Sequence, residues 1–144
     1  ARTRRFGRDL ALAMIDIDFF KDYNDSTGHP VGDKALAAIG GIIRNSIRET
    51  DIPFRYGGEE FAIILPETTA ESATYVAERI RSAVDKHEFL RESSQPNGAL
   101  TVSIGISMLG EDCDNLEEFV SAADKALYKA KSIGRNRVVA FSGD

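Results

Sequence analysis

Apolar runs along the chain predict the strands of one sheet. The run at residues 10–17 is almost continuously apolar, which is typical of a central strand buried on both faces. Two further runs, 52–54 and 61–65, are separated by a glycine-rich turn and predict a hairpin. Residues 100–108 alternate large apolar with small residues, so we expect one face of this strand to be covered and the other closely approached. Residues 138–141 predict a final, short edge strand.

Longer segments with apolar residues at helical spacing predict amphipathic helices between these strands. One follows Pro30 and ends near Arg48. A second follows a capping box predicted for Thr68 and Glu71, and a third begins at Asn115. The expected fold is therefore an α/β sandwich of the α+β kind, with helices on the faces of a central, mostly antiparallel sheet.

The turn of the hairpin carries two glycines and two acids, Gly57, Gly58, Glu59 and Glu60. Because tight hairpin turns favour backbone angles that glycine reaches without strain, the glycine pair predicts such a turn. Neighbouring side chains of a strand point to opposite faces, so Glu59 and Glu60 reach one site only if the backbone bends, and we expect different roles for them. The alternative is that both acids simply keep the tip hydrated.

Two carboxylates mark the end of the first apolar run. Asp16 follows the six apolar residues 10–15. An ionised carboxylate beside a buried strand is costly unless it is paired or bound to a cation, so we expect Asp16 to bind a cation. Asp18 is expected to cap the helix that follows.

Glycines between residues 24 and 41 predict a loop and a close contact. Residues 24–33 are rich in turn formers and in side-chain donors and acceptors, which is typical of a binding loop. Asn24 and Asp33 either bind a ligand there or only cap and turn the chain. Gly40 and Gly41 each weaken a helix by about 1 kcal/mol relative to alanine, so we expect close backbone packing at that point.

Composition narrows the class of protein. With 144 residues, 42% hydrophobic and 28% charged, the chain fits a single domain with one core. Its formal net charge of -5 argues against a nucleic-acid partner, so a phosphate ligand must be held locally. The one cysteine, Cys113, cannot form an internal disulfide, and no apolar run reaches the length of a membrane span. We therefore expect a cytoplasmic domain.

Five ordered motifs resemble those of the GGDEF domains, the diguanylate cyclase family. They lie at residues 14–21 (Met-Ile-Asp-Ile-Asp-Phe-Phe-Lys), 24–33, 55–61 (Arg-Tyr-Gly-Gly-Glu-Glu-Phe), 102–105 (Val-Ser-Ile-Gly) and 124–136. The likeness covers almost the whole chain, and residues 1–144 are expected to form one GGDEF domain. The signature is present in its Gly-Gly-Glu-Glu-Phe form.

The resemblance implies a palm-like fold shared with nucleotidyl cyclases and polymerases. It also implies condensation of two GTP into cyclic di-GMP and pyrophosphate by a two-fold homodimer, in which each copy holds one GTP. In such a site Asp16, the backbone carbonyl of Ile17 and Glu59 bind magnesium, with manganese as the alternative metal. Glu60 is then the second catalytic acid, which orients or deprotonates the attacking 3'-hydroxyl.

The resemblance further assigns residues to the substrate. Lysine and arginine side chains hold the triphosphate, and Lys21 is also counted among the catalytic residues. An aspartate and an amide read the guanine base, since they complement its ring N–H, its exocyclic amine and its edge. The implied substrate-binding residues are Lys21, Asn24, Asp33, Gly58, Lys131 and Arg135.

Arg48 and Asp51 lie where the family places a product-inhibition site of the form Arg-x-x-Asp. Arginine forks onto phosphate and aspartate meets a guanine edge, so this pair suits cyclic di-GMP, with Arg79 contributing from the facing helix. The alternative for Arg48 is a favourable interaction with the dipole of the helix that it ends.

The family's leader segment before the first strand is not found here, and we expect an upstream sensor domain in a longer parent protein, with or without a membrane anchor. The rival interpretation is a catalytically silent module that binds cyclic di-GMP or GTP as a sensor or dimerisation domain. Silent members usually lose a signature glycine or acid, whereas Gly57, Gly58, Glu59, Glu60 and Asp16 are all present.

Overall fold

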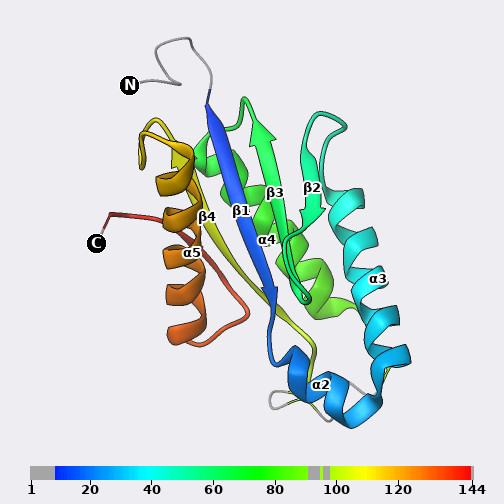
Figure 1. Ribbon diagram of the computed structural model, residues 1–144. Coiled ribbons are helices and arrows are strands. Elements are labelled where there is room, and N and C mark those ends of the chain that lie inside the picture. The colour runs from blue at the N-terminus through cyan, green and yellow to red at the C-terminus, as the bar shows by residue number, and fades with distance from the viewer. Residues whose placement is uncertain (1–8, 91–94, 96–97, 144) are drawn as a thin grey trace.

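One sheet flanked by helices organises the computed structural model, which describes residues 9–90, 95 and 98–143 (Figure 1). In chain order the elements are β1 (Leu10–Ile17), α2 (Phe20–Thr27), α3 (His29–Ser46), β2 (Ile52–Arg55), β3 (Glu60–Pro66), α4 (Ala70–Lys86), β4 (Val102–Leu109), α5 (Leu116–Ser132) and β5 (Val138–Ala140). Among these helices, none combines the length and the apolar character that crossing a bilayer requires.

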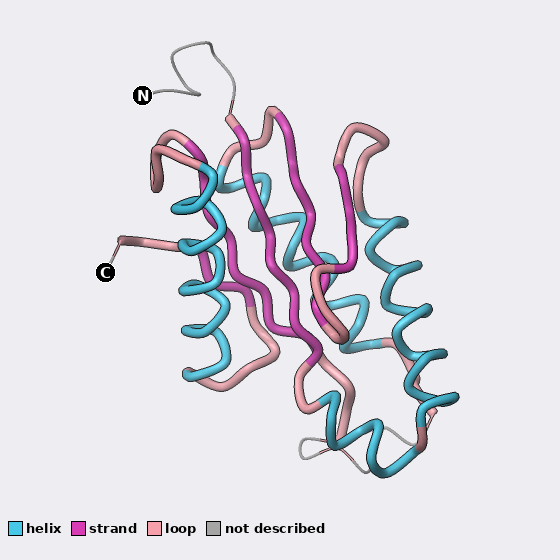
Figure 2. The backbone as a smooth tube through the Cα atoms, in the orientation of Figure 1, coloured by secondary structure: helices cyan, strands magenta, loops and turns pink. Residues whose placement is uncertain are grey.

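The sheet has the strand order β2-β3-β1-β4-β5, with β1 at its centre (Figure 2). All neighbouring strands pair antiparallel except β4 and β5, which pair parallel. Seven of the eight residues of β1 are buried, as its continuous apolar run predicts. The expected α+β class with a mostly antiparallel sheet is therefore confirmed.

Alternation along the strands builds a separate core on each face of the sheet. Ala11, Ala13, Ile15 and Ile17 of β1 pack with α3 and α4 in the larger core. Leu12 and Met14 project to the other face, where they pack against α5. Figure 1 shows this arrangement, with α5 crossing one face and α4 lying behind the sheet. Odd-numbered side chains at the end of β1 therefore lie on the α3/α4 face, and even-numbered side chains lie on the α5 face.

Gly105 of β4 lets α5 approach the sheet closely. A Cβ at this position would lie 2.2 Å from the backbone nitrogen of Leu127 and 2.4 Å from the carbonyl oxygen of Ala123. Both atoms belong to the backbone of α5, so no side-chain rotation can make room. The predicted close approach to this strand is confirmed.

Helix starts agree with the sequence in one case and differ in another. Asn115 caps α5, since its side chain accepts a hydrogen bond from Glu118 N–H at 2.9 Å. The capping box predicted for Thr68 is wrong by one residue. Thr69 caps α4 by accepting from Ser72 N–H at 3.2 Å, whereas Thr68 is buried and its hydroxyl bonds the carbonyl of Pro66.

The loop predicted for residues 24–33 is also wrong, because most of these residues are helical. Helix α2 continues to Thr27 and α3 begins at His29, so Gly28 alone, at φ 94°, turns the chain between them. Asp18 does not cap α2. The cap position is Phe19, which has a left-handed backbone and makes no side-chain capping bond.

The hairpin turn does not need glycine for its backbone angles. Gly57 and Gly58 are not among the glycines with positive φ in the described part of the chain, so the predicted reason for the pair is wrong. Space does not require glycine at Gly57 either, because a Cβ there would lie 3.0 Å from Oε1 of Glu60, the end of a flexible side chain that can move. The turn is closed by Tyr56 N–H and Gly57 N–H, which both donate to the carbonyl of Glu60.

The close packing expected at Gly40 and Gly41 is not found. A Cβ at Gly40 would make ordinary contacts at 3.8 and 3.9 Å, and a Cβ at Gly41 would have no described atom within 4 Å beyond its own helix turn. Helix α3 therefore carries a destabilising glycine that packing does not require.

Gly41→Ala is expected to raise the free energy of unfolding by about 0.5–1 kcal/mol, because alanine restricts the unfolded chain and favours the helix. Urea denaturation followed by circular dichroism measures the change. An unchanged or lower stability would show that the position is more constrained than its open surroundings indicate.

Candidate active site

The end of β1 and the tip of the β2–β3 hairpin lie side by side. Asp16 stands opposite Glu60 in the antiparallel register of β1 and β3, and Ile17 N–H donates to the carbonyl of Glu59 at 3.3 Å. Opposite residues of an antiparallel pair project to the same face, so Asp16 and Glu60 share the face that α5 covers. Glu59 reaches β1 through its backbone.

Asp16 is a buried carboxylate with spare bonding capacity. Its side chain is 4% exposed as a residue, and Oδ2 forms an ion pair with Nζ of Lys131. Oδ1 is buried and has no hydrogen-bond partner among the described residues. Because an unsatisfied buried oxygen is unfavourable, this atom fits a further cation.

The acids around Asp16 hold their protons more tightly than usual. Burial raises the pKa of Glu59. Burial, followed by the charges of Asp124 and Glu59, raises the pKa of Glu60. Burial also raises the pKa of Asp124 on α5. A divalent cation bound among these groups would offset their mutual repulsion and favour their ionised forms.

A metal at this position needs more than side-chain ligands. Within residues 9–90, 95 and 98–143, no three His, Cys, Asp or Glu side chains gather closely enough to hold a metal by themselves. Carboxylate and carbonyl oxygens are hard donors, and magnesium commonly takes one or two carboxylates together with substrate phosphates. The donor set around Asp16 therefore fits a metal that enters with a phosphorylated ligand.

Cationic side chains face the carboxylates from the end of α5. Burial, and secondly the positive charge of Arg135, lowers the pKa of Lys131. The guanidinium of Arg135 lies over the ring of Phe19, 4.4 Å from the centroid. Two neighbouring cations beside a buried acid make a local anion site in a chain of negative net charge.

The residues expected to read guanine lie at the α2–α3 junction. Oδ1 of Asn24 is buried without a hydrogen-bond partner in the described structure, and Nδ2 lies 3.4 Å from Nδ1 of His29. Gly32 makes room for this amide, since a Cβ there would lie 1.8 Å from Oδ1 of Asn24. Asp33 follows Gly32 and is exposed.

Lys21 is not drawn toward the buried acids. It lies on α2, and its ammonium forms an exposed ion pair with Asp25 at 3.6 Å. This i,i+4 pair belongs to the helix surface. The structure thus brings Asp16, Glu60, Lys131 and Arg135 together and leaves Lys21 at the rim.

The Arg-x-x-Asp segment forms its own compact site. Nη2 of Arg48 lies 2.7 Å from Oδ1 of Asp51, and Arg48 N–H donates to Oδ2 at 2.8 Å. The hydrogen bond to Asp51 raises the pKa of Arg48. Nη2 also donates to the carbonyl of Pro66 and to Oγ1 of Thr68. Arg48 lies two residues beyond Ser46, the last residue of α3, and these oxygens are its main contacts.

A hollow of about 250 Å³ opens beside this pair and is lined in part by Arg48, Asp51 and Arg79. Arg79 comes from α4, and its guanidinium donates to the backbone carbonyl of Ser46. Arg48, Asp51 and Arg79, which the family resemblance assigns to one site, therefore line the same hollow.

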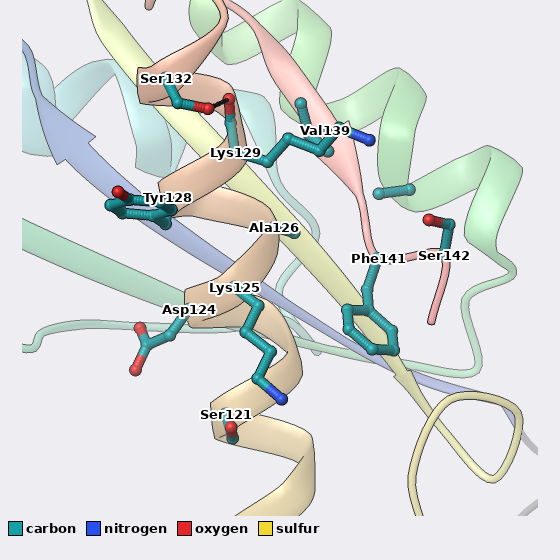
Figure 3. A pocket seen from close by; sticks show the side chains of 11 residues that line it. Ser121, Asp124, Lys125, Ala126, Tyr128, Lys129, Ser132, Val139, Phe141 and Ser142 are labelled. Atoms are coloured by element: carbon teal, nitrogen blue, oxygen red, sulfur yellow. Dashed lines mark hydrogen bonds between the residues drawn. The ribbon is translucent and has the colours of Figure 1, made fainter. Parts of the chain in front are cut away.

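Another hollow, of about 510 Å³, lies between α5 and the C-terminal segment, and none of the predicted site residues is among the described residues that line it. Figure 3 shows Lys125 on the side of α5 nearer Phe141, while Asp124 and Tyr128 project from the other side. The buried acid Asp16 lies elsewhere, at the end of β1.

The geometry at β1 and the hairpin tip agrees with a sequence comparison. Residues 1–137 match the family model described as diguanylate cyclase, GGDEF domain. The chain belongs to the GGDEF family. The predicted resemblance is thereby confirmed.

Curated GGDEF relatives are longer proteins. Diguanylate cyclase A of Treponema denticola is 45% identical over 129 residues, which are 90% of this chain and 34% of that protein. Response regulator PleD of Caulobacter vibrioides is 40% identical over 133 residues, 92% of this chain and 29% of that protein. The chain spans about a third of the length of these relatives.

Solved GGDEF domains share the fold over nearly the whole chain. The active GGEEF domain of a diguanylate cyclase from Vibrio cholerae has a TM-score of 0.88 at 34% identity, covering 99% of this chain and 89% of that one. The GGDEF domain of DgcB from Caulobacter crescentus, in complex with c-di-GMP, has a TM-score of 0.85 at 35% identity, covering 96% and 81%.

Sequence reasoning missed some residues of this GGDEF site. Asp124 affects Glu60 across the space between α5 and the hairpin, and Phe19 supports Arg135. Asp18, taken for a helix cap, bonds Thr101 and Ser103 of the neighbouring chain segment. Their positions in the sequence could have indicated them, because Asp18 and Phe19 closely follow Asp16 and Asp124 is the first residue of the last motif.

Proposed function

We propose that this chain is the catalytic domain of a diguanylate cyclase, which condenses two GTP into one cyclic di-GMP and two pyrophosphates. The observation that carries the proposal is the buried Asp16, opposite Glu60 and beside Lys131, with one carboxylate oxygen unsatisfied. The names of the relatives, which are diguanylate cyclases, support it.

Asp16, the carbonyl of Ile17 and Glu59 would hold a divalent metal, magnesium or, as the alternative, manganese. When bound, the metal neutralises triphosphate charge and polarises the α-phosphate. Lys131 and Arg135 hold the β- and γ-phosphates and stabilise the charge that develops on the departing pyrophosphate. Lys131 then exchanges its contact with Asp16 for one with phosphate.

Glu60 accepts the proton of the attacking 3'-hydroxyl. Its raised pKa favours this role, because a carboxylate with a higher pKa is a stronger base. The alkoxide oxygen attacks the α-phosphorus of the other GTP, a new phosphodiester bond forms, and the bond to pyrophosphate breaks.

Guanine is bound at the α2–α3 junction. The unsatisfied Oδ1 of Asn24 accepts from the base edge, and Asp33 accepts from the ring N–H and the exocyclic amine. Gly58, exposed at the hairpin tip, allows the nucleotide to approach the backbone. Lys21, at the rim on α2, reaches the phosphates once its surface pair with Asp25 opens.

The reaction needs two copies of the domain. The product is two-fold symmetric and each copy supplies one guanine site, so two domains meet face to face and each presents its 3'-hydroxyl to the other's α-phosphate. An upstream sensor domain in the full-length protein would set how often they meet.

The test is incubation of the chain, alone and as a dimer enforced by a fused leucine zipper, with GTP and magnesium. We expect the enforced dimer to form cyclic di-GMP and pyrophosphate in a 1:2 ratio, measured by liquid chromatography. A dimer that binds GTP and forms no product would instead support the silent binding module.

We further propose that cyclic di-GMP inhibits the enzyme by binding the hollow beside Arg48, Asp51 and Arg79. Arg48→Ala is expected to weaken cyclic di-GMP binding at least about 10-fold, because a charge-assisted bond to phosphate is lost. Isothermal titration calorimetry measures the affinity, and the initial rate without product should persist.

Arg44→Ala is the matched control, because it removes an exposed arginine one helix turn earlier on α3. Its affinity for cyclic di-GMP should equal that of the unmodified chain. Equal affinity in Arg48→Ala as well would argue against this inhibitory site.

A further inference from the structure

Asp18 is a buried carboxylate that the proposed metal site does not use. It is 3% exposed, and it accepts hydrogen bonds from Oγ1 of Thr101 and Oγ of Ser103, both at 2.7 Å. Its Oδ2 also accepts from the backbone N–H of Asn136 at 3.0 Å, across 118 positions of the chain. A buried acid with three donors is a fixed anchor rather than a free ligand.

The loop that Asp18 anchors has an unfavourable backbone. Arg135 and Asn136 both have left-handed angles, with φ of 63° and 48°, although neither is glycine. Such angles persist only where surrounding contacts hold them. Arg135 N–H donates to the carbonyl of Ala130 at 2.9 Å, and Nε of Arg137 donates to the carbonyl of Arg135 at 3.1 Å.

The side chain of Asn136 ties the same loop to α4. Its Oδ1 accepts from Nη1 of Arg81 at 2.8 Å, and its Nδ2 lies 3.4 Å from Oδ2 of Asp85. Arg81 is itself paired with Glu78. Asn136 is therefore held from β4 and the end of β1 through its backbone and from α4 through its amide.

These contacts fix the position of Arg135. Its guanidinium lies over Phe19, the residue that directly follows Asp18, and Asp18 N–H donates to the carbonyl of Thr101 at 2.9 Å. Asp18 thus fixes both the loop that carries Arg135 and the backbone that carries the ring beneath it.

We propose that Asp18 and Asn136 form a brace that sets the position of Arg135 for the β- and γ-phosphates of a nucleoside triphosphate. Asp18 is a positioning residue in this arrangement and does not contact the nucleotide. The proposal rests on the proposed function, because it takes Arg135 as a triphosphate contact.

The test compares binding of GTP and GMP, which differ only in the phosphates that Arg135 would contact. Asp18→Ala is expected to weaken GTP binding about 10-fold, the order of one charge-assisted bond, and to leave GMP binding unchanged. Arg135→Ala should show the same split. The double variant should bind GTP no more weakly than Arg135→Ala alone, since both changes remove one interaction.

Thr101→Val is the matched control. It removes one hydroxyl donor to Asp18 while the bond between Asp18 and Asn136 remains, so its ratio of GTP to GMP affinity should equal that of the unmodified chain. If Asp18→Ala does not fold, Asn136→Ala provides the test, because its amide contacts are only partly buried.

The possible outcomes test the Asp18–Asn136 brace separately from the proposed function. If the unmodified chain binds GTP no more tightly than GMP, the proposed function fails and the brace with it. If Arg135→Ala weakens GTP binding while Asp18→Ala and Asn136→Ala do not, the brace alone is wrong. Equal losses for GTP and GMP in Asp18→Ala would likewise overturn it, since they indicate a general structural role.

Discussion

Asp16→Asn is expected to lower cyclic di-GMP formation by at least about 100-fold while the domain stays folded. The change keeps the shape of the side chain and removes the negative charge that pairs with Lys131 and that would hold the metal. The effect on stability should be small, because Lys131 is partly exposed and can be hydrated once the pair is lost, and Oδ1 of Asp16 has no partner in the described structure. Rates are measured on the enforced dimer.

A second measurement separates loss of the metal from loss of the nucleotide. Magnesium should strengthen GTP binding to the unmodified chain, and Asp16→Asn should lose that dependence. Glu71→Gln removes an exposed acid in the first turn of α4, at the other end of the sheet, and serves as the control. Normal turnover by Asp16→Asn would disprove the role assigned to Asp16.

Gly105→Ala is expected to lower the free energy of unfolding by about 3 kcal/mol, the upper range for overpacking a core. The added Cβ would meet the backbone of α5 at 2.2 Å, so the helix must move away from the sheet. Since α5 carries Lys131 at its end, turnover should fall as well. Urea denaturation and the cyclase assay measure the two effects.

The comparison with Gly41→Ala makes this prediction specific. Both changes replace a glycine of negative φ by alanine, and only Gly105 has backbone in the space that the methyl group would fill. Opposite signs of the stability change are expected. A Gly105→Ala variant as stable as the unmodified chain would show that α5 can shift at little cost.

Patterns that depend on burial were predictable from the sequence. The continuous run of β1, the small-large alternation of β4 and the stripe of α5 each reflect which face meets a neighbour, and each element is found as expected. The grouping of Arg48, Asp51 and Arg79 around one hollow was also foreseen, although from family resemblance rather than from spacing.

Features set by tertiary contacts were not predictable. The register that places Asp16 opposite Glu60 depends on how β1 and β3 pair, which neither strand specifies by itself. Asp18 looked like a helix cap because a cap needs only local sequence, whereas its partners lie more than 80 residues away. Residues 24–33 looked like a loop because turn formers are also tolerated at helix ends.

The outer strands of the sheet bear on how copies of the domain can meet. Strand β2 has four residues and contains Pro53, which has no N–H to offer a further strand, and β5 has three residues. If the domain works as the proposed pair, its copies meet at high local concentration, where exposed strand edges favour fibre growth. Both edge strands are too short, or too interrupted by proline, to pair with a strand of another copy. Copies can therefore meet often and still separate.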